Sequence, residues 1–233
     1  MDTKLLVKLR PLFHKFPPLY FKRGQVVIRP EDKIDNIYFI EKGFVRFYFL
    51  SDEGKELTFL IYKPGYFFPV LYAFFGEKTR YYFEALTPLV LRRAPRETFT
   101  NIVSTNNALS LSVSKEIILR MQGILSKIEL LTLGTAYQNT AFTLLICAQE
   151  FGKRKKNSIV LNFPLAHKDI ASMAGVTRET VSIEMKKLQK QGLISYKRNH
   201  IKGLISYKRN HIIIKNIDNF KKKTKVELNY EYF

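Results

Sequence analysis

Short hydrophobic runs separated by polar, glycine-centred turns occupy the first part of the chain. Glycines at 43, 54, 65 and 76 recur every eleven residues, in turn-like contexts such as Asp52-Glu53-Gly54-Lys55. The runs between and beside them are rich in aromatic and β-branched residues and lie at 26–28, 37–40, 44–49, 57–62, 81–86 and 89–91. Short strands at this regular spacing predict an antiparallel β-sandwich or barrel.

A long helix is predicted from about Asn106 to Leu133, because this stretch lacks proline and contains a single glycine. Asn106 or Thr105 is the expected N-cap. Apolar residues spaced 4, 3, 4 and 3 apart predict a dimer seam of the coiled-coil type, made of Ile117, Met121, Ile124, Ile128 and Leu131. The alternative is that this stripe packs on the chain's own barrel. Both can hold, because a second apolar face is formed by Leu119, Leu125 and Leu130.

Two further helical patterns meet at Gly175. Residues 166–174 carry apolar positions on one face, and Thr177 is placed to cap a second helix. On that second helix one face is apolar and is predicted to point inward, namely Val181, Met185 and Leu188. The opposite face is predicted to point outward and comprises Arg178, Glu179, Ser182, Ile183 and Lys186. This pattern predicts a helix-turn-helix with an exposed recognition face, the alternative being an ordinary helical hairpin with a solvated face.

The outward side chains suit the edges of bases in the major groove of DNA. Arg178 can bond O6 and N7 of guanine, and Glu179 can accept from N4 of cytosine. Ser182 can reach a base edge or a phosphate, and Ile183 can touch a thymine methyl group. The predicted DNA-binding residues are Lys168, Thr177, Arg178, Glu179, Ser182, Ile183, Lys186, Lys197 and Arg198.

The charge of the chain agrees with a polyanionic partner. Its 233 residues include 39 Lys and Arg against 20 Asp and Glu, a net charge of +19. Residues 152–233 alone hold 19 basic and 6 acidic residues, so about two-thirds of the excess lies in the last third of the chain. This asymmetry predicts a C-terminal nucleic-acid-binding domain, although a basic surface that binds nothing in particular has the same composition.

Composition excludes several other classes. Hydrophobic residues make up 46% of the chain, which is too many for a disordered protein. A single cysteine, Cys147, excludes an internal disulfide, a cysteine-based zinc site and an iron–sulfur cluster within one chain. No histidine falls between residues 15 and 166, so the predicted barrel lacks the ligands of a cupin-type metal enzyme. No signal peptide and no membrane span are expected, which predicts a cytoplasmic protein.

The run from Asp169 to Ser182, followed by Leu188 and Gly192-Leu-Ile-Ser195, resembles the winged helix of the cyclic-AMP receptor / fumarate–nitrate regulator (CRP/FNR) family. The order of β-roll, long helix and helix-turn-helix is also similar to that family, over nearly the whole chain. The resemblance implies a homodimeric bacterial transcription regulator, not an enzyme. It also implies as partners a palindromic operator in double-stranded DNA, a small-molecule effector and, for an activator, RNA polymerase.

The fold implied by the resemblance is α+β. Residues 1–105 form an antiparallel β-roll, a double-stranded β-helix like that of cyclic-nucleotide-binding domains, which serves as sensor. Residues 106–134 form the dimerisation helix, and residues 135–233 form the winged helix-turn-helix. The rival hypothesis is a nonspecific, architectural DNA-binding protein whose roll is purely structural.

The chain departs from the family pattern at both functional sites. Ile183 stands where family members usually carry a recognition-helix arginine. In the effector pocket Arg80 matches the phosphate-binding arginine, but Val70 replaces the ribose-binding glutamate and Tyr81 replaces a serine. A ribose buried against Val70 would lose about 1–3 kcal/mol per unpaired hydroxyl. We therefore predict that the protein does not use cyclic AMP.

The matching pocket residues are Phe68, Val70, Leu71, Arg80, Tyr81, Ile124 and Leu125. Because this region is rich in aromatic residues, the pocket either takes an apolar or aromatic effector or is filled by its own side chains. No cofactor is predicted. For haem, His14 is the nearest candidate ligand.

The predicted wing contains an identical repeat. Residues 192–201 recur as residues 203–212, with Lys202 between the copies. Because an eleven-residue shift is odd, the second copy must loop out, form an extra hairpin or displace the first. Its basic residues would add phosphate contacts. Of two other basic runs, 153–156 is predicted to be a loop and 221–225 a solvated tail, with a supporting phosphate contact as the alternative for 221–225.

Overall fold

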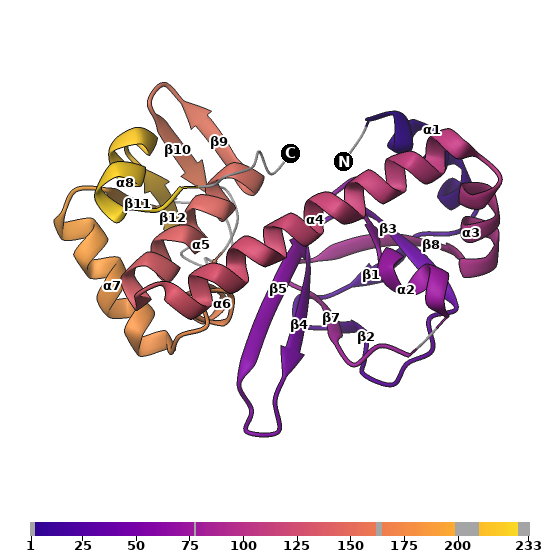
Figure 1. The fold of residues 1–233 in the computed structure, drawn as a ribbon, viewed down its shortest axis with the longest axis horizontal. Helices are drawn as coiled ribbons and strands as arrows, with labels where there is room; N and C mark the ends of the chain where they lie inside the picture. The colour runs from indigo at the N-terminus through magenta and orange to yellow at the C-terminus, as the bar shows by residue number, and fades with distance from the viewer. Residues whose placement is uncertain (1–2, 77, 162–164, 199–209, 228–233) are drawn as a thin grey trace, which may run out of the picture. The chain divides into compact units, whose positions relative to one another are not determined.

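The computed structural model describes residues 3–76, 78–161, 165–198 and 210–227 (Figure 1). The chain divides into two compact units between Gln122 and Gly123. In the described parts of the chain, no helix is both long and apolar enough to cross a membrane.

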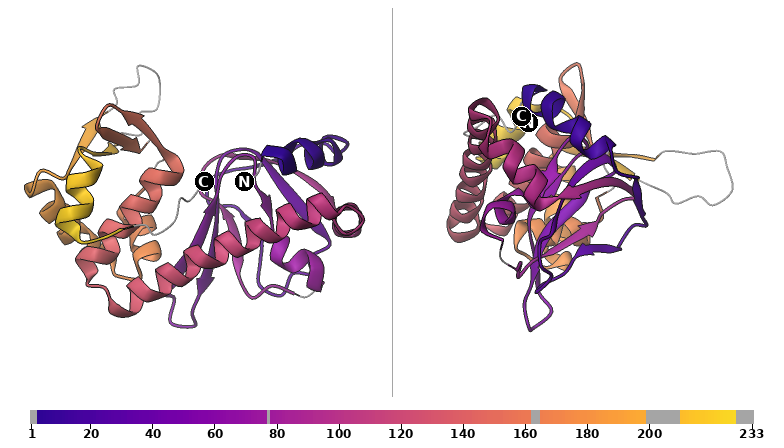
Figure 2. Two further views of the ribbon diagram at one scale, coloured as in Figure 1. Left: turned by 45° about the horizontal axis from the view of Figure 1, so that its top comes forward. Right: turned by 90° about the vertical axis from the view of Figure 1, so that its right-hand side faces the viewer.

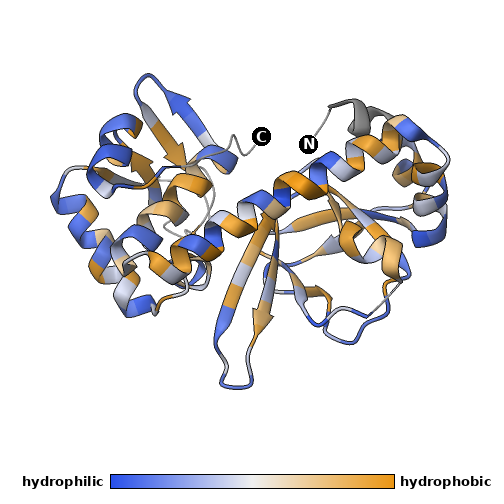
Figure 3. Cartoon of the chain, viewed as in Figure 1, coloured by the Kyte–Doolittle hydropathy of each residue, from blue (hydrophilic) through white to orange (hydrophobic). Residues whose placement is uncertain are grey.

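The N-terminal unit is an antiparallel β-roll of two four-stranded sheets. One sheet has the order β1 (Leu19–Phe21), β8 (Leu89–Pro95), β3 (Asn36–Lys42) and β6 (Phe67–Phe68). The other has the order β2 (Val26–Ile28), β7 (Tyr82–Ala85), β4 (Val45–Leu50) and β5 (Glu56–Tyr62). The β4–β5 hairpin extends beyond the rest of the roll, and its tip is hydrophilic (Figures 1, 2 and 3). The predicted fold class is confirmed.

The evenly spaced glycines form the turns that the sequence predicts. Gly43, Gly54, Gly65 and Gly76 all have positive φ, between 67° and 90°, where a side chain would strain the backbone. Gly43 is further constrained by its neighbours, because a Cβ atom there would clash with the carbonyl oxygen of Pro88. Between Gly43 and Gly65 the period of eleven residues reflects one strand and one turn, whereas the interval from Gly65 to Gly76 contains β6 and a short helix, Val70–Phe75, of which Gly76 is the C-cap.

Two hydrophobic clusters stabilise this unit. The first lies where α1 (Thr3–His14), α3 (Arg96–Ser104) and the start of α4 (Asn107–Leu133) cover β3 and β6, with Phe13, Phe67 and Phe99 fully or almost fully buried. The second lies inside the roll, around Phe68, Phe83 and Leu91. A short helix, α2 (Val70–Phe75), follows β6. The helix α4 begins one residue after the predicted start, and the side-chain Oδ1 of Asn106 accepts from the backbone N–H of Leu109 at 3.1 Å.

The C-terminal unit combines a group of helices with a four-stranded sheet. Its helices are α5 (Ala136–Phe151), α6 (His167–Ala174) and α7 (Arg178–Lys190), and α8 (Ile217–Thr224) follows the last strand. The sheet has the order β11 (Ile194–Arg198), β12 (Asn210–Ile214), β10 (Ser158–Leu161) and β9 (Gly152–Lys155), and α5 and α7 pack against it. Two predictions were wrong here. The basic run after Gly152 is strand β9, because Ile159 and Val160 of β10 pair with Arg154 and Lys153. The run at 221–225 continues α8, which Asn216 caps and which buries Phe220.

The first copy of the repeat occupies the core position of the wing. Its Leu193 and Ile194 are buried, and the following residues form β11. The partner strand β12 contains the last three residues of the second copy, with Ile212 and Ile214 buried. Residues 199–209, which include most of the second copy, lie outside the described residues.

Candidate nucleic-acid interface

The turn between α6 and α7 is built by Gly175 and Thr177. Gly175 has φ +64°, and a Cβ atom there would lie 2.7 Å from Cδ2 of Leu131. The positive φ favours glycine here, whereas the contact with the end of the Leu131 side chain could be relieved by a shift of that side chain. Thr177 caps α7 as predicted, with its hydroxyl accepting from the N–H of Thr180 at 3.1 Å.

The recognition helix α7 separates a buried face from an exposed one. Val181, Met185 and Leu188 are at most 1% exposed. The side chains predicted to contact DNA lie on the other side of the helix or at its start: Thr177, Arg178, Glu179, Ile183 and Lys186 are exposed, and Ser182 is partly exposed. Lys168, near the start of α6, is also exposed. The two sides of α7 are thus buried and exposed as the helical pattern predicts, and contact of the exposed side with DNA stays a prediction.

Two polar side chains of this region were not singled out by the sequence. Glu184 is 7% exposed, and its Oε1 accepts from Nζ of Lys187 at 2.8 Å, while its Oε2 lacks a hydrogen-bond partner among the described residues. His167 is partly buried, and its Nδ1 lies 2.8 Å from Oγ of Ser182. Helical periodicity did not single out Glu184 as a buried residue. His167 could not be found by local pattern, because its partner is fifteen residues away on another helix.

The predicted wing contacts are only partly described. Lys197 and Arg198 lie in β11, where their backbones pair with His211 and Asn210. The side chains of Lys197 and Arg198 lie outside what the structure describes, so their contact with phosphate stays a prediction. His211 lies on the partner strand β12, and its imidazole Nδ1 is 3.0 Å from the carbonyl oxygen of Leu161 at the end of β10.

Helix α4 carries an exposed apolar stripe that differs in part from the predicted seam. The stripe consists of Leu111, Ile118, Met121, Leu125 and Ile128, each between 53% and 60% exposed. It shares Met121 and Ile128 with the predicted seam. Ile117 instead packs on the first core cluster, Ile124 is partly buried, and Leu131 lies against Gly175. The exposed stripe is therefore rotated around the helix relative to the prediction, away from the core.

Aromatic rings pack against one another inside the roll. Phe68 stacks on Phe83 with ring centroids 5.3 Å apart, and Phe47 lies 4.8 Å from Phe83. Tyr81 closes the row, with its edge toward Phe47 at 5.0 Å and toward Phe59 at 5.4 Å. Of the predicted effector-pocket residues, Phe68 and Tyr81 belong to this row.

Three other predicted pocket residues, Val70, Leu71 and Arg80, do not belong to this row of rings. Val70 packs on the first core cluster, on the other side of β6, and Leu71 is 53% exposed. Arg80 is exposed, with its guanidinium 5.6 Å from the ring centre of Phe49. Ile124 and Leu125 lie on the part of α4 that belongs to the C-terminal unit.

A second arginine, which the sequence did not single out, stacks beside the roll interior. The guanidinium of Arg120 on α4 lies 4.7 Å from the ring centres of both Tyr62 and Tyr66. Glu116 accepts from it at 2.9 Å. Burial raises the pKa of Tyr62, so this phenol stays neutral under physiological conditions.

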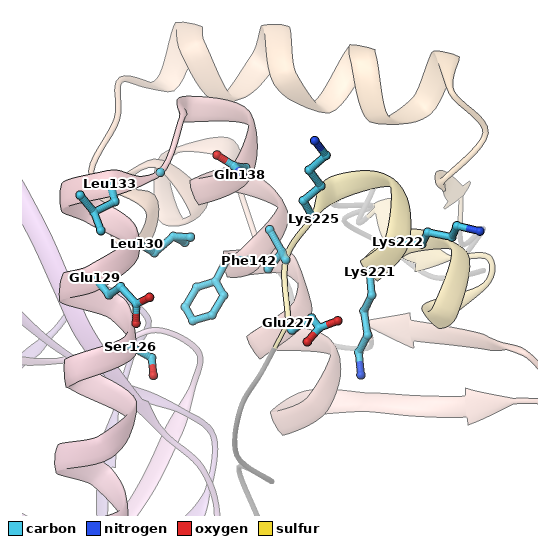
Figure 4. A pocket seen from close by; sticks show the side chains of 12 residues that line it. Ser126, Glu129, Leu130, Leu133, Gln138, Phe142, Lys221, Lys222, Lys225 and Glu227 are labelled. Atoms are coloured by element: carbon cyan, nitrogen blue, oxygen red, sulfur yellow. The ribbon is translucent and has the colours of Figure 1, made fainter.

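The C-terminal unit contains a cavity of about 590 Å³ between the end of α4, α5 and α8 (Figure 4). Its apolar side includes Leu130, Leu133 and Phe142. Its charged lining consists of Lys221, Lys222, Lys225, Glu129 and Glu227. The ammonium groups of Lys222 and Lys225 point away from Phe142 in Figure 4, so these cations are not directed at a ligand in the apolar part. Among the described residues, His, Cys, Asp and Glu side chains form no group of three or more that could hold a metal ion.

Two family models match the two units. Residues 18–106 match the cyclic nucleotide-binding domain, and residues 140–203 match the Crp-like helix-turn-helix domain. Among solved structures, a CooA variant from Carboxydothermus hydrogenoformans is 24% identical with a TM-score of 0.75, covering 96% of this chain and 97% of the other. FixK2 from Bradyrhizobium japonicum is 19% identical with a TM-score of 0.73, covering 89% of this chain and 96% of the other.

Curated relatives agree with these matches. The global nitrogen regulator of Nostoc sp. is 28% identical over 80% of this chain and 85% of its own length. The anaerobic regulatory protein of Bacillus subtilis is 26% identical over 79% of this chain and 82% of its own length. The cAMP-activated global transcriptional regulator CRP of Pasteurella multocida is 24% identical over 78% of this chain and 85% of its own length. With a sensor-type β-roll, a long helix and a recognition helix in the expected order, the chain belongs to the CRP/FNR family of DNA-binding transcription regulators, which are not enzymes.

Proposed function

We propose that the protein is a homodimeric, sequence-specific regulator that binds a palindromic operator in double-stranded DNA. The observation that carries this proposal is the division of α7 into a buried apolar face and an exposed face bearing Arg178, Glu179 and Ser182. These three side chains offer both donors and acceptors to the edges of bases, which is what direct readout in the major groove requires. A merely architectural binder needs cations alone.

The exposed stripe of α4 supports the dimer. Apolar residues at heptad-like spacing on a surface helix are normally covered by a partner helix. A second copy of α4 covers the same residues on both chains and relates the two recognition helices by two-fold symmetry. Such a dimer reads two half-sites about one helical turn apart, which is why we expect a palindrome.

We further propose that the dimer does not respond to cyclic AMP. Val70 packs on the core cluster outside the roll interior, where it offers no hydrogen bond to a ribose. The contacting rings of Phe47, Phe68 and Phe83 favour a roll filled by its own side chains, or one that admits only an apolar or aromatic effector. Calorimetry is expected to give no saturable heat with micromolar cyclic AMP, and a saturable isotherm at that concentration overturns this part of the proposal. With one cysteine in the sequence, we also expect no iron–sulfur cluster.

The main test is selection of randomised duplex DNA by the purified full-length chain, without added effector. Anisotropy titrations then compare the enriched duplex with a scrambled duplex of the same composition. We expect an enriched palindrome that binds at least 1,000-fold more tightly than the scrambled control, roughly the lower end of specific recognition. Salt-sensitive binding with no enriched sequence contradicts the proposal and favours a nonspecific architectural protein, for which the net charge of +19 would suffice.

A further inference from the structure

A side-chain hydrogen bond joins the two helices of the helix-turn-helix beside the exposed face of α7. His167 is the first residue of α6, and Ser182 lies one turn into α7. The imidazole Nδ1 is 2.8 Å from Oγ of Ser182. The same hydroxyl lies 3.0 Å from the carbonyl oxygen of Arg178, one turn earlier on α7. Ser182 is therefore held by two partners rather than free to rotate.

The positions of the protons follow from what each atom can donate. A carbonyl oxygen only accepts, so the contact of Arg178 with Ser182 requires the hydroxyl proton to lie between the two oxygens. A hydroxyl has one proton, which is thereby used. The bond to His167 must then be donated by the Nδ1–H of the imidazole. The opposite assignment would leave the lone pairs of two oxygens facing each other at 3.0 Å.

This arrangement makes Ser182 an acceptor. Its oxygen has two lone pairs, of which one takes the bond from His167, and the other accepts no bond from the described residues. Phosphate oxygens also only accept, so they offer nothing to this lone pair. In the major groove the complementary donors are the N4 amino group of cytosine and the N6 amino group of adenine.

We propose that His167 is a positioning residue that sets part of the operator specificity: it holds Ser182 as an acceptor, so that Ser182 selects a base bearing an amino group. This inference rests on the proposed sequence-specific binding and assigns one of its readout positions. The imidazole acts in its neutral form near pH 7, because burial and the positive charge of Arg178 both lower the pKa of His167 below its usual 6.5.

Four variants separate positioning from packing. His167→Asn places its amide nitrogen where Nδ1 lies and keeps the donor to Ser182. His167→Gln has a similar size, but its amide reaches the place of Nε2 and loses this donor. Ser182→Ala removes the acceptor itself, and His167→Ala removes both bulk and donor. Thermal melting of each variant, with its affinity for scrambled DNA, reports whether the helix-turn-helix is intact.

The probes are the enriched operator and duplexes in which one amino group at a time is removed. Purine replaces adenine, and pyrimidin-2-one replaces cytosine, at each position of both half-sites. For the wild type we expect one position at which this removal weakens binding about tenfold per half-site, the value of one good hydrogen bond. The same loss is expected for His167→Asn. We expect it to fall below about threefold for His167→Gln and to vanish for Ser182→Ala.

Two results would overturn the inference while leaving the proposed function intact. One is a tenfold loss that persists in folded His167→Gln and His167→Ala. The other is that removal of each amino group from the operator weakens binding of the wild type and of Ser182→Ala by the same factor. If the wild type enriches no sequence at all, the proposed function fails, and this inference fails with it. The comparison of His167→Asn with His167→Gln does not depend on His167→Ala, because these two variants differ in where they place the amide group. It therefore stands even if His167→Ala does not fold.

Discussion

Disrupting the exposed stripe of α4 is expected to dissociate the dimer. The perturbation is the double substitution Met121→Glu and Leu125→Glu, at neighbouring positions on the same face. Both residues are exposed in the single chain, at 60% and 53%. Neither belongs to a core cluster of the single chain, so the fold of the protomer should survive the change.

The magnitude follows from the exposed fractions. Complete burial of a Leu or Met side chain contributes about 1.5–3 kcal/mol. Since roughly half of each side chain is still exposed, covering it in a dimer contributes about 1 kcal/mol. Two residues in each of two protomers then give about 4 kcal/mol, which corresponds to a weakening of the dimer by about 1,000-fold. Four carboxylates brought together in the interface weaken it further.

Sedimentation equilibrium over a range of protein concentrations measures this dissociation constant directly. The matched control is Leu71→Glu with Phe75→Glu, which replaces two equally exposed apolar residues on α2, at 53% and 70%, by the same charges. We expect the control to dimerise like the wild type. A double variant on α4 that dimerises with the wild-type constant, while the control also does, would refute the assignment of this stripe to the dimer interface.

Three further outcomes are expected. Arg178→Ala should lower the discrimination between operator and scrambled DNA in anisotropy titrations by about tenfold or more per half-site, because it removes the bidentate donor to guanine, and an unchanged ratio would contradict this. Burial lowers the pKa of Lys127 from 10.5 to about 8, so unfolding takes up a proton between these pH values. Lys127→Met should therefore raise the free energy of unfolding, measured by urea denaturation, by about 3 kcal/mol at pH 7 and by little at pH 10.5. The control Lys115→Met, at an exposed position, should leave the free energy of unfolding unchanged at both pH values. Deleting residues 192–202 leaves one copy of the repeat and should reduce the slope of log affinity against log salt, while an equal slope means that the extra copy does not touch DNA.

The turns and faces that local chemistry dictates could be predicted from the sequence. Glycines such as Gly43 and Gly54 mark turns because their backbone conformation excludes other residues, and the strands follow from the distances between them. The inward and outward faces of α7 follow from helical periodicity alone. Helices α1 and α3 were not predicted, because no comparable glycine residues mark their ends and packing on the roll stabilises them.

The register of the exposed stripe on α4 could not be predicted from periodicity. Helix α4 is apolar on more than one face, and a spacing of 4 and 3 fits Ile117 and Ile124 as well as Ile118 and Leu125. Only the fold decides between them, because the first core cluster takes Ile117 and leaves Ile118 at 56% exposed. A pattern of apolar residues identifies a helix that contacts something, but the partner of each face is set by tertiary packing.

The same distinction explains why the recognition helix is easier to predict from sequence than the sensor. A DNA-reading face is a row of polar residues on one helix, so all its members lie within one pattern. The roll interior is assembled from β4, β6 and β7, and whether Phe47, Phe68 and Phe83 line a pocket or fill it depends on ring contacts between strands far apart in sequence. Since the ring centroids of the two contacting pairs lie 4.8 and 5.3 Å apart, an effector could enter between the rings only by separating them. Binding of an effector between these rings would therefore be coupled to repacking of the roll, in contrast to a ligand that occupies a pre-formed polar pocket.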